Sequence, residues 1–208
     1  MNNESRLSEL KDYEKLSRSY YNKVASRFDY SLDGVFSLPF KKLIAHDLKL
    51  DEGAKILDVG SANGKLLDYL SRKQAINGFG LEISENFVAI ARQSYPQFSF
   101  HQGSALSMPF PKDSFDVLIC SASFHHFPNP RQFLKEARRV LKNDGRLVIA
   151  EIHLPIFLKY YNQYLDKYNH EGDVKVYSPR ELAHLFAISG FELIKKRIIL
   201  QIQYYELK

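Results

Sequence analysis

The stretch KILDVGSANG, residues 55–64, decides the fold, because an apolar run ends there in Asp58 and leads into a turn with two glycines. Gly60 lets the backbone turn sharply, since it has no side chain, and Gly64 lets the next helix pack close to the strand. In an open parallel sheet, ligands bind beyond the carboxyl ends of the strands, and the amides that open the next helix favour a negative charge. The stretch therefore predicts a nucleoside site at the first strand-to-helix turn.

The spacing of the glycines argues against a dinucleotide at this turn. A dinucleotide fingerprint has glycines at its first, third and sixth positions. Counted from Gly60, the third position is Ala62 and the sixth is Lys65. The carboxylate of Asp58 would also repel a pyrophosphate. An acidic strand end instead suits a ligand that carries a positively charged amino group.

A second carboxylate follows at the end of the next apolar run. The segment GFGLEIS, residues 78–84, contains Glu82 at the expected end of the second strand. A carboxylate in this place can accept hydrogen bonds from both hydroxyls of a ribose. A surface glutamate near the start of a helix is the simpler alternative. Together with the glycine turn, however, Glu82 favours a nucleoside site.

Short apolar runs alternate with helical patterns from residue 54 to residue 152. The expected strands are AKILDVG at 54–60, NGFGLEI at 77–83, FSFHQG at 98–103, FDVLICSA at 115–122 and RLVIAEI at 146–152. The expected helices between them cover residues 65–72, 84–95 and 130–142. Such alternation predicts a doubly wound, Rossmann-like α/β sheet, mostly parallel, with helices on both faces in three α/β/α layers.

Further elements flank this core. Helical spacing of apolar or aromatic residues predicts four more helices, over residues 5–28, 36–48, 156–168 and 178–189. Ser178 and Glu181 have the spacing of a capping box, which opens the last of these helices. Residues 191–208 predict two strands, but no Gly, Pro or Asn marks the turn between them.

The composition is that of an ordinary globular domain. The 208 residues are 45% hydrophobic and 25% charged, which suits one domain with a sizeable core. The polar start is unlike a signal peptide, and no stretch is apolar enough to span a bilayer. Cys120 is the only cysteine, so an internal disulfide is excluded and a reducing compartment fits. We therefore expect a cytoplasmic protein.

The formal net charge of +5 permits a nucleic-acid partner without requiring one. The basic residues are scattered, with short clusters only at Lys41–Lys42, Arg138–Arg139 and 195–197. For clusters that lie in expected helices and strands, a solvated face is the simpler explanation. Nucleic acid is therefore a possible partner but not the favoured one.

Three segments together resemble the class I S-adenosylmethionine-dependent methyltransferases, in particular the small-molecule branch that includes the ubiquinone and menaquinone methyltransferases. ILDVGSANG resembles that family's glycine motif, and QGSALSMPF at 102–110 resembles its motif after the third strand. The closest similarity is in FDVLICSASFHHFPNPRQFLKEARRVLKNDGRLVIAE at 115–151. The resemblance covers about residues 20–155 well and the tail loosely. It implies a single methyltransferase domain with an antiparallel C-terminal strand.

The resemblance implies S-adenosylmethionine as the cofactor and S-adenosylhomocysteine as the product. The positions that it assigns to cofactor binding are Tyr21, Asp58, Gly60, Ser61, Asn63, Gly64, Glu82, Ile83, Ser104, Ala105 and Ser121. The chain departs from the family pattern at three positions. Ala62 replaces a glycine, Ser104 replaces an Asp at the adenine amino group, and Phe28 replaces a Tyr in the segment that folds over the cofactor. Tyr21 or Tyr30 could supply the missing hydroxyl.

A histidine pair, His125 and His126, follows the fourth strand beside the expected methyl position. Either histidine could act as a catalytic base that deprotonates an acceptor, and His126 is slightly preferred. The alternative is that the pair only hydrogen-bonds the loop or the cofactor. The histidines lack a convincing metal partner in the sequence, and a magnesium-binding carboxylate set is missing, so no metal is expected.

The whole chain, 1–208, is thus expected to form one domain. Its parts are an N-terminal helical cap at 1–50, a cofactor-binding core at 51–152, a lid insertion at 153–177, and a C-terminal helix with strands at 178–208. The expected reaction is methyl transfer to a small-molecule acceptor, aromatic or lipid-like, by a monomer or homodimer. A tRNA or rRNA base methyltransferase and a non-catalytic S-adenosylmethionine-binding protein remain the alternatives.

Overall fold

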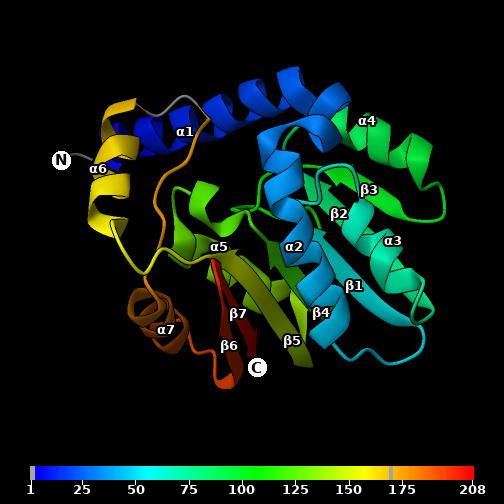
Figure 1. Cartoon of the computed structure of the whole chain (residues 1–208). Helices are drawn as coiled ribbons and strands as arrows, with labels where there is room; N and C mark the ends of the chain where they lie inside the picture. The colour runs from blue at the N-terminus through cyan, green and yellow to red at the C-terminus, as the bar shows by residue number, and fades with distance from the viewer. Residues whose placement is uncertain (1–2, 169–170) are drawn as a thin grey trace.

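The computed structural model describes residues 3–168 and 171–208, with side chains from residue 13 onward. The strands in this part of the chain are β1 (Ala54–Val59), β2 (Ile76–Glu82), β3 (Ser99–Gln102), β4 (Phe115–Ser121), β5 (Leu141–Ile152), β6 (Leu193–Ile199) and β7 (Ile202–Leu207). They form one sheet in the order β3-β2-β1-β4-β5-β7-β6 (Figure 1). β7 runs antiparallel to β5 and β6, whereas β1 to β5 pair in parallel. The predicted fold class is confirmed.

Helices cover both faces of this sheet. They are α1 (Asn3–Val24), α2 (Leu32–Asp47), α3 (Lys65–Ser71), α4 (Glu85–Ser94), α5 (Pro130–Val140), α6 (Leu158–Tyr168) and α7 (Pro179–Ile188), with short 3₁₀ helices η1 (Ala25–Tyr30) and η2 (Phe124–His126). α2, α3 and α4 pack on one face, and α5 and α7 pack on the other. α1 lies across the carboxyl ends of the strands (Figure 1). The side of the sheet where a ligand is expected is therefore covered by the N-terminal segment.

The side chains of β1 alternate between two apolar cores. Leu57 and Val59 belong to the core under α5 and α7, whereas Ile56 belongs to the core under α2, α3 and α4. Since successive side chains point to opposite faces of a sheet, Asp58 shares the face of Ile56. The carboxylate that ends the first strand is thus directed toward the α2 side of the molecule.

The N-terminal helices differ in their bounds from the prediction. The helix expected over 5–28 ends at Val24 and continues as η1, which carries the buried Phe28. The second helix begins at Leu32 because Ser31 caps it, accepting a hydrogen bond from the Gly34 amide at 3.1 Å. The side chains of residues 5–12 lie outside the described part.

One further boundary corrects the prediction toward the C-terminus. The chain leaves α5 at Val140 and enters β5 directly, so residues 141–142, which were expected in the helix, belong to the strand, and the strand begins before the expected residue 146. The turn that the sequence did not mark falls between β6 and β7, where Leu200 adopts a left-handed φ of +52°. The capping box of Ser178 and Glu181 is present at the start of α7.

Residues 153–177, the expected lid, contain α6 and a return segment; residues 169–170 lie outside the described residues. α6 exposes a row of large side chains, which includes Tyr160, Tyr164 and Tyr168. The return segment is anchored to the loop after β4, because the amides of Val174 and Lys175 donate to the carbonyl of His125 at 2.8 and 3.2 Å. It therefore lies against the histidine pair.

Asp47, at the end of α2, ties that helix to the C-terminal strands. The side chain is 3% exposed and pairs with Arg197 and with Lys195, the latter at 3.3 Å. Burial by itself raises the pKa of Asp47, but hydrogen bonds from Arg197, His46 and Lys195 outweigh it and lower the pKa to about 2. The carboxylate is thus stabilised in its ionised form in the folded protein.

Asp47→Asn tests this tie through its pH dependence. An unfolded aspartate titrates near ~3.9, so the contribution is complete above about pH 5 and is lost as the pH falls toward 2. We expect the variant to lower the free energy of unfolding at pH 7 by about 1 kcal/mol, because the basic partners are partly exposed and screened. Urea unfolding from pH 7 to pH 3 measures this, with Asp51→Asn at an exposed position as the control. A difference between variant and wild type that is independent of pH would contradict the interpretation.

Candidate active site

The turn after β1 requires glycine at its first position. Gly60 has a φ of +75°, and a Cβ there would lie 2.3 Å from the Ser123 hydroxyl oxygen. The Gly60 amide donates to the Leu81 carbonyl at 2.8 Å, which ties the turn to the end of β2. Ala62, which departs from the family's glycine pattern, has a φ of +45°. The turn therefore keeps the left-handed conformation at this position although the residue is an alanine.

Glu82 joins the first turn to the end of the second strand. Its carboxylate is buried, and its two oxygens accept hydrogen bonds from the Ala62 and Ser84 amides, both at 2.9 Å. Burial raises the pKa of Glu82, and these backbone amides oppose the rise. An ionised carboxylate has about four acceptor sites, so Glu82 can still accept hydrogen bonds from a ligand.

Asp58 is electrostatically coupled to a buried lysine that the sequence interpretation missed. Lys41 of α2 is 8% exposed and lines the cavity described below, so a solvated face was the wrong explanation for it. Burial raises the pKa of Asp58 to about 7, against the opposing charge of Lys41 and with a further contribution from Glu82. Burial lowers the pKa of Lys41 to about 8, against the charge of Asp58. The acidic group of Asp58 and the basic group of Lys41 thus lie close enough to affect each other's pKa.

Several buried oxygen atoms around the first turn have no hydrogen-bond partner among the described residues. They are Asp58 Oδ1, Ser61 Oγ, Asn63 Oδ1 and Ser121 Oγ. A buried polar atom without a partner costs about 1–3 kcal/mol, so a ligand that donates hydrogen bonds here would remove that cost. S-adenosylmethionine carries an amino group and ribose hydroxyls, and these unsatisfied acceptors fit such a ligand.

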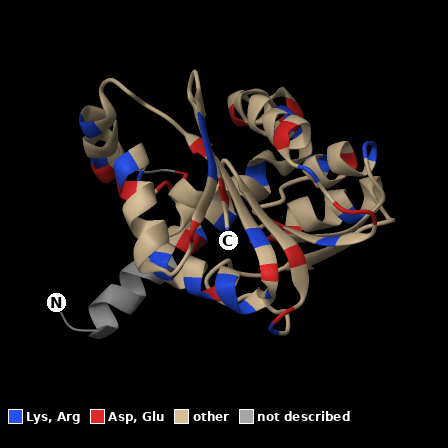
Figure 2. Ribbon diagram, turned by 90° about the horizontal axis from the view of Figure 1, so that it is seen from below, with Lys and Arg blue, Asp and Glu red and all other residues tan. Residues whose placement is uncertain are grey.

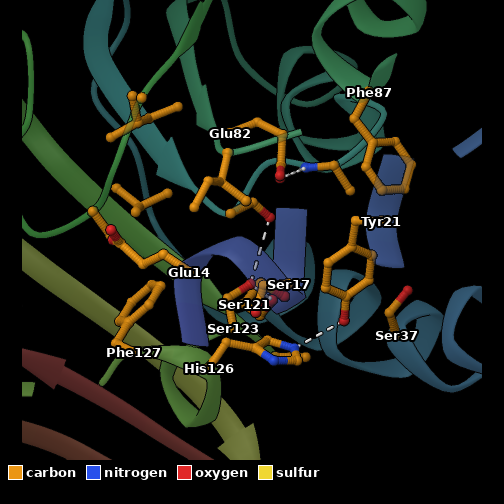
Figure 3. Close-up of a pocket in the computed structure, with 18 of the residues that line it drawn as sticks. Glu14, Ser17, Tyr21, Ser37, Glu82, Phe87, Ser121, Ser123, His126 and Phe127 are labelled. Carbon is orange, nitrogen blue, oxygen red and sulfur yellow. Dashed lines mark hydrogen bonds between the residues drawn. The ribbon is translucent and has the colours of Figure 1, made fainter. Parts of the chain in front are cut away.

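A cavity opens above this turn, between the N-terminal helices and the ends of the strands (Figure 3). Of the predicted site residues, it is lined by Tyr21, Gly60, Glu82, Ile83, Ala105, Ser121 and His126. The remaining predicted residues lie next to that lining and not in it: Asp58, Ser61, Asn63, Gly64, Ser104 and His125. The pocket wall thus combines segments from the cap, the β1 and β2 turns and the loop after β4.

The position at which the family has an aspartate is filled by two residues that act together. Ser104 donates a hydrogen bond from its hydroxyl to the carboxylate of Glu14 on α1, while the Leu106 amide donates to the Ser104 hydroxyl at 3.0 Å. Glu14 lines the cavity. Residue 104 itself has no carboxylate, but the carboxylate of Glu14 lies beside it. Glu14 belongs to α1 and is 90 residues earlier in the chain.

The other end of the cavity contains a chain of three polar side chains. The Tyr21 hydroxyl lies 2.8 Å from His126 Nε2 (Figure 3), and His126 Nδ1 lies 2.8 Å from Asp173 Oδ1. Burial and the neighbouring His125 lower the pKa of His126, against the effect of Asp173. Asp173 comes from the return segment after α6, and no motif in the sequence identifies it as a site residue.

His125 lies behind this chain, with its own carboxylate partner. His125 Nδ1 lies 2.8 Å from Glu151 Oε1, and the Glu151 side chain is fully buried at the end of β5. Burial alone lowers the pKa of His125, but Glu151, assisted by Asp173, outweighs it and raises the pKa to about 9. Glu151 was part of the predicted fifth strand but was not recognised as a site residue.

Of the two tyrosines considered as replacements for Phe28, only one is near the site. Tyr30 is 92% exposed and so cannot serve. Tyr21 lines the cavity, where its ring packs on Phe28 and Phe87 with centroid distances of 6.4 and 6.0 Å. Its hydroxyl is directed toward His126 at the end of the cavity opposite Glu14.

The comparisons with known proteins agree with this geometry. Residues 57–149 match the methyltransferase domain family. A demethylmenaquinone methyltransferase of Chlorobaculum parvum is 29% identical over 164 residues, which are 72% of this chain and 68% of that protein. The YcgJ protein of Bacillus subtilis aligns with a TM-score of 0.67 at 25% identity, over 78% of this chain and 73% of that one. A methyltransferase structure from Aquifex aeolicus shares the fold, with a TM-score of 0.69 at 21% identity over 88% and 97% of the two chains.

A doubly wound sheet with two buried carboxylates at the ends of adjacent parallel strands fits a nucleoside-binding protein, and the match to the methyltransferase domain family gives its class. The chain belongs to the class I S-adenosylmethionine-dependent methyltransferases, and S-adenosylmethionine is its cofactor. None of the helices in residues 3–168 and 171–208 has both the length and the hydrophobicity needed to cross a bilayer.

Gly60→Ala tests whether the first turn needs glycine for space as well as for its φ angle. Gly53 has the same φ of +75°, but a Cβ there would meet nothing within 4 Å. We expect Gly53→Ala to lower the free energy of unfolding by about 1 kcal/mol from left-handed strain alone, and Gly60→Ala by about 2–4 kcal/mol, since the clash with Ser123 is added. Chemical denaturation of both variants measures this. Equal losses would show that the approach of Ser123 is unimportant.

Proposed function

We propose that the protein transfers a methyl group from S-adenosylmethionine to a small-molecule acceptor that is aromatic or lipid-like. The observation that carries the proposal is the pair of buried carboxylates, Asp58 and Glu82, at the ends of neighbouring strands beside the cavity. A similar protein named demethylmenaquinone methyltransferase supports an acceptor of this kind. When bound, the cofactor supplies a methyl group on a positively charged sulfur.

In this proposal, different residues bind different parts of the cofactor. Glu82 accepts hydrogen bonds from the ribose hydroxyls, and Asp58 holds the amino group. Lys41, which lines the same cavity, pairs with the carboxylate of the methionine part. At the adenine end, Ile83 packs on the ring, and Ala105 offers its backbone amide. Gly60, Gly64, Ser61, Asn63 and Ser121 complete the turn and its polar contacts.

Glu14 takes the place of the family's aspartate at the adenine amino group. The Ser104 hydroxyl donates to Glu14 and so can hold that carboxylate at the edge of the cavity. A carboxylate accepts from an amino group more strongly than a hydroxyl does. We propose that the pair of Ser104 and Glu14 together performs the role that the family pattern gives to one residue.

The acceptor enters, in this proposal, at the end of the cavity lined by Tyr21 and His126 (Figure 3). His126 is the histidine proposed to meet the acceptor, since His125 does not line the cavity. Both ring nitrogens of His126 have partners, Tyr21 and Asp173, so the ring is held in one orientation. Aligning the acceptor with the methyl group and excluding water are the main tasks of these residues, and alignment is worth up to ~7–11 kcal/mol in ideal cases.

The alternatives have less support. An RNA substrate would favour a concentrated basic face, but Lys and Arg are interspersed with Asp and Glu along the ribbon (Figure 2). A protein that only senses the cofactor would not need the aligned histidine chain at the far end of the cavity. We further propose that the chain acts as one domain in the cytoplasm, as a monomer or homodimer, with the segment 153–177 as a lid over the acceptor.

Glu82→Ala tests the assignment of the ribose. We expect the dissociation constant of S-adenosylhomocysteine to rise at least tenfold, or about 1.4 kcal/mol, because two hydrogen bonds to the ribose and two to the backbone are lost. Isothermal titration calorimetry measures it. Glu85→Ala, which removes a surface carboxylate paired with Arg18 at 2.8 Å, is the matched control. Unchanged affinity in a folded Glu82→Ala protein would refute the assignment.

The raised pKa of Asp58 predicts a pH dependence of cofactor binding. In the free protein the carboxyl has a pKa of about 7, so below pH 7 it is mostly neutral and cannot pair with an ammonium group. We expect the affinity for S-adenosylhomocysteine to rise with pH between 6 and 7 and then to level off, with release of a proton on binding. Titrations in buffers of different ionisation enthalpy would detect that proton. Asp58→Asn should bind weakly with no such rise, and a wild-type affinity that is flat from pH 6 to 8 would contradict the role.

A further inference from the structure

Three side chains behind the end of the cavity that His126 lines bring potential metal ligands together. One potential ligand atom from each of His125, His126 and Asp173 lies within 4.8 Å of the other two. Asp173 Oδ1 lies 2.8 Å from His126 Nδ1 and 3.8 Å from His125 Nε2. Ligand atoms around one ion with bonds of about 2.1 Å lie ~3–4 Å apart. The triangle formed by the ligand atoms of His125, His126 and Asp173 therefore needs only a small adjustment to surround an ion.

The far nitrogen of each histidine has a partner of the kind that orients a metal ligand. His125 Nδ1 is held by Glu151 Oε1 at 2.8 Å, and His126 Nε2 is held by the Tyr21 hydroxyl at 2.8 Å. Metal-binding histidines almost always donate their other N–H to a carboxylate, carbonyl or similar group, which fixes the ring and the tautomer. Glu151 thus orients His125 so that its Nε2 faces the carboxylate oxygen of Asp173, a position where either a proton or a metal cation can lie between the two atoms.

The third ligand is held in place by the return segment after α6. The amides of Val174 and Lys175 donate to the His125 carbonyl. Gly172 packs on α1, where a Cβ would lie 2.1 Å from the Ser17 hydroxyl oxygen, and Ser17 donates to the Gly172 carbonyl at 3.4 Å. Asp173 is therefore anchored on both sides, which a ligand site requires if it is to exist before the ion binds.

The charge around the triangle is negative. Glu151 and Asp173 both contact the histidine pair, and Asp33 and Glu171 act on the same groups from α2 and the return segment. Two imidazole nitrogens and one carboxylate, with positions left open, form a donor set that suits divalent iron or zinc better than magnesium or calcium. A transition-metal cation would compensate this charge.

We propose that His125, His126 and Asp173 bind a divalent transition-metal ion at the acceptor end of the cavity. The inference rests on the proposed function in one respect, that His126 borders the acceptor. An ion with three protein ligands has room for an oxygen of the acceptor, so the acceptor class is narrowed to molecules with a hydroxyl or enol. Coordination lowers the pKa of a bound hydroxyl; its O–H bond breaks, and the proton passes to solvent. The oxygen would then use its electron pair to form a bond to the methyl carbon, while the C–S bond of the cofactor breaks and its electron pair stays on the sulfur of S-adenosylhomocysteine.

In this arrangement His126 serves as a ligand and not as a base. Its Nδ1 binds the ion in place of its hydrogen bond to Asp173, and its Nε2–H donates to the Tyr21 hydroxyl. Glu151 and Tyr21 are then positioning residues, because they act through the histidines. His126 cannot be a metal ligand and a catalytic base at the same time. A measurement of metal binding without turnover therefore distinguishes the two roles.

The experiment uses tag-free full-length protein, freed of metal with a chelator and titrated with Zn²⁺ or Co²⁺. We expect one equivalent to bind, and the Co²⁺ complex to show visible absorption bands typical of nitrogen and oxygen ligands. Asp173→Asn and His126→Ala should each raise the dissociation constant at least tenfold. His184→Ala, which removes an exposed histidine of α7, should leave binding unchanged. Absence of stoichiometric binding, or binding indifferent to Asp173→Asn, would overturn the proposal and leave a proton-bridged ion pair.

The cofactor titration distinguishes this failure from failure of the proposed function. S-adenosylhomocysteine is titrated into the metal-free protein and into Asp173→Asn, which also verifies that the variant is folded. If the cofactor binds but neither metal does, the metal site is refuted and the methyltransferase assignment stands. If a metal binds at these residues but the cofactor does not, the assignment of the cavity is refuted and the metal site stands.

Discussion

The pair of hydrogen bonds that Glu82 accepts from the backbone is the interaction on which the site depends. One bond comes from Ala62 in the turn after β1 and the other from Ser84 at the start of α4. A single buried carboxylate thus fixes two loops from adjacent strands with respect to each other. Because these loops form the floor of the cavity, their relative position determines whether Asp58 and Glu82 can contact one ligand. The fold places β1 and β2 side by side, and the hydrogen bonds to Glu82 fix the positions of the loops that follow them.

The site is built at a cost in stability. Asp58 and Lys41 are buried with shifted pKa values in opposite directions, and nearby oxygens of Ser61 and Ser121 have no partner in the described residues. Unsatisfied buried groups destabilise the folded protein, and apolar replacements would remove the penalty. A ligand that satisfies these groups gains that energy as binding affinity. The same groups therefore weaken the free protein and favour the complex.

The sequence predicted the fold well, because the signals that define it are local. Alternating apolar runs and helical patterns identified β1 to β5 and the three α/β/α layers. The capping box at Ser178 identified the start of α7. The turn between β6 and β7 escaped notice because Leu200 adopts a left-handed φ without the glycine or asparagine that usually indicates one. Such strain is imposed by the pairing of the two strands, which a local pattern does not contain.

The site was harder to predict, since its parts come from distant segments. Motifs next to the strand ends pointed to Gly60 and Glu82, which the structure places in the cavity wall. Glu14, Lys41 and Asp173 carry no motif, and only the tertiary fold brings them there. Lys41 in particular lies within an ordinary basic pair on a helix. One departure from the family pattern was informative. Ser104 stands where the family has an aspartate, so a carboxylate is missing there, and in the structure Glu14 of α1 lies beside that position.

The way in which the cap meets the core connects binding to folding. Glu14 and Tyr21 reach the cavity from α1, and α1 with η1 packs near the cavity through a small apolar cluster that contains Phe28 and Phe87. Segments held by few buried apolar contacts open at lower free energy than the core. A ligand that contacts both the cap and the strand ends binds only when they are together, and it stabilises that state in proportion to its affinity. A cofactor bound between α1 and the strand ends would therefore hold α1 in place together with the apolar cluster.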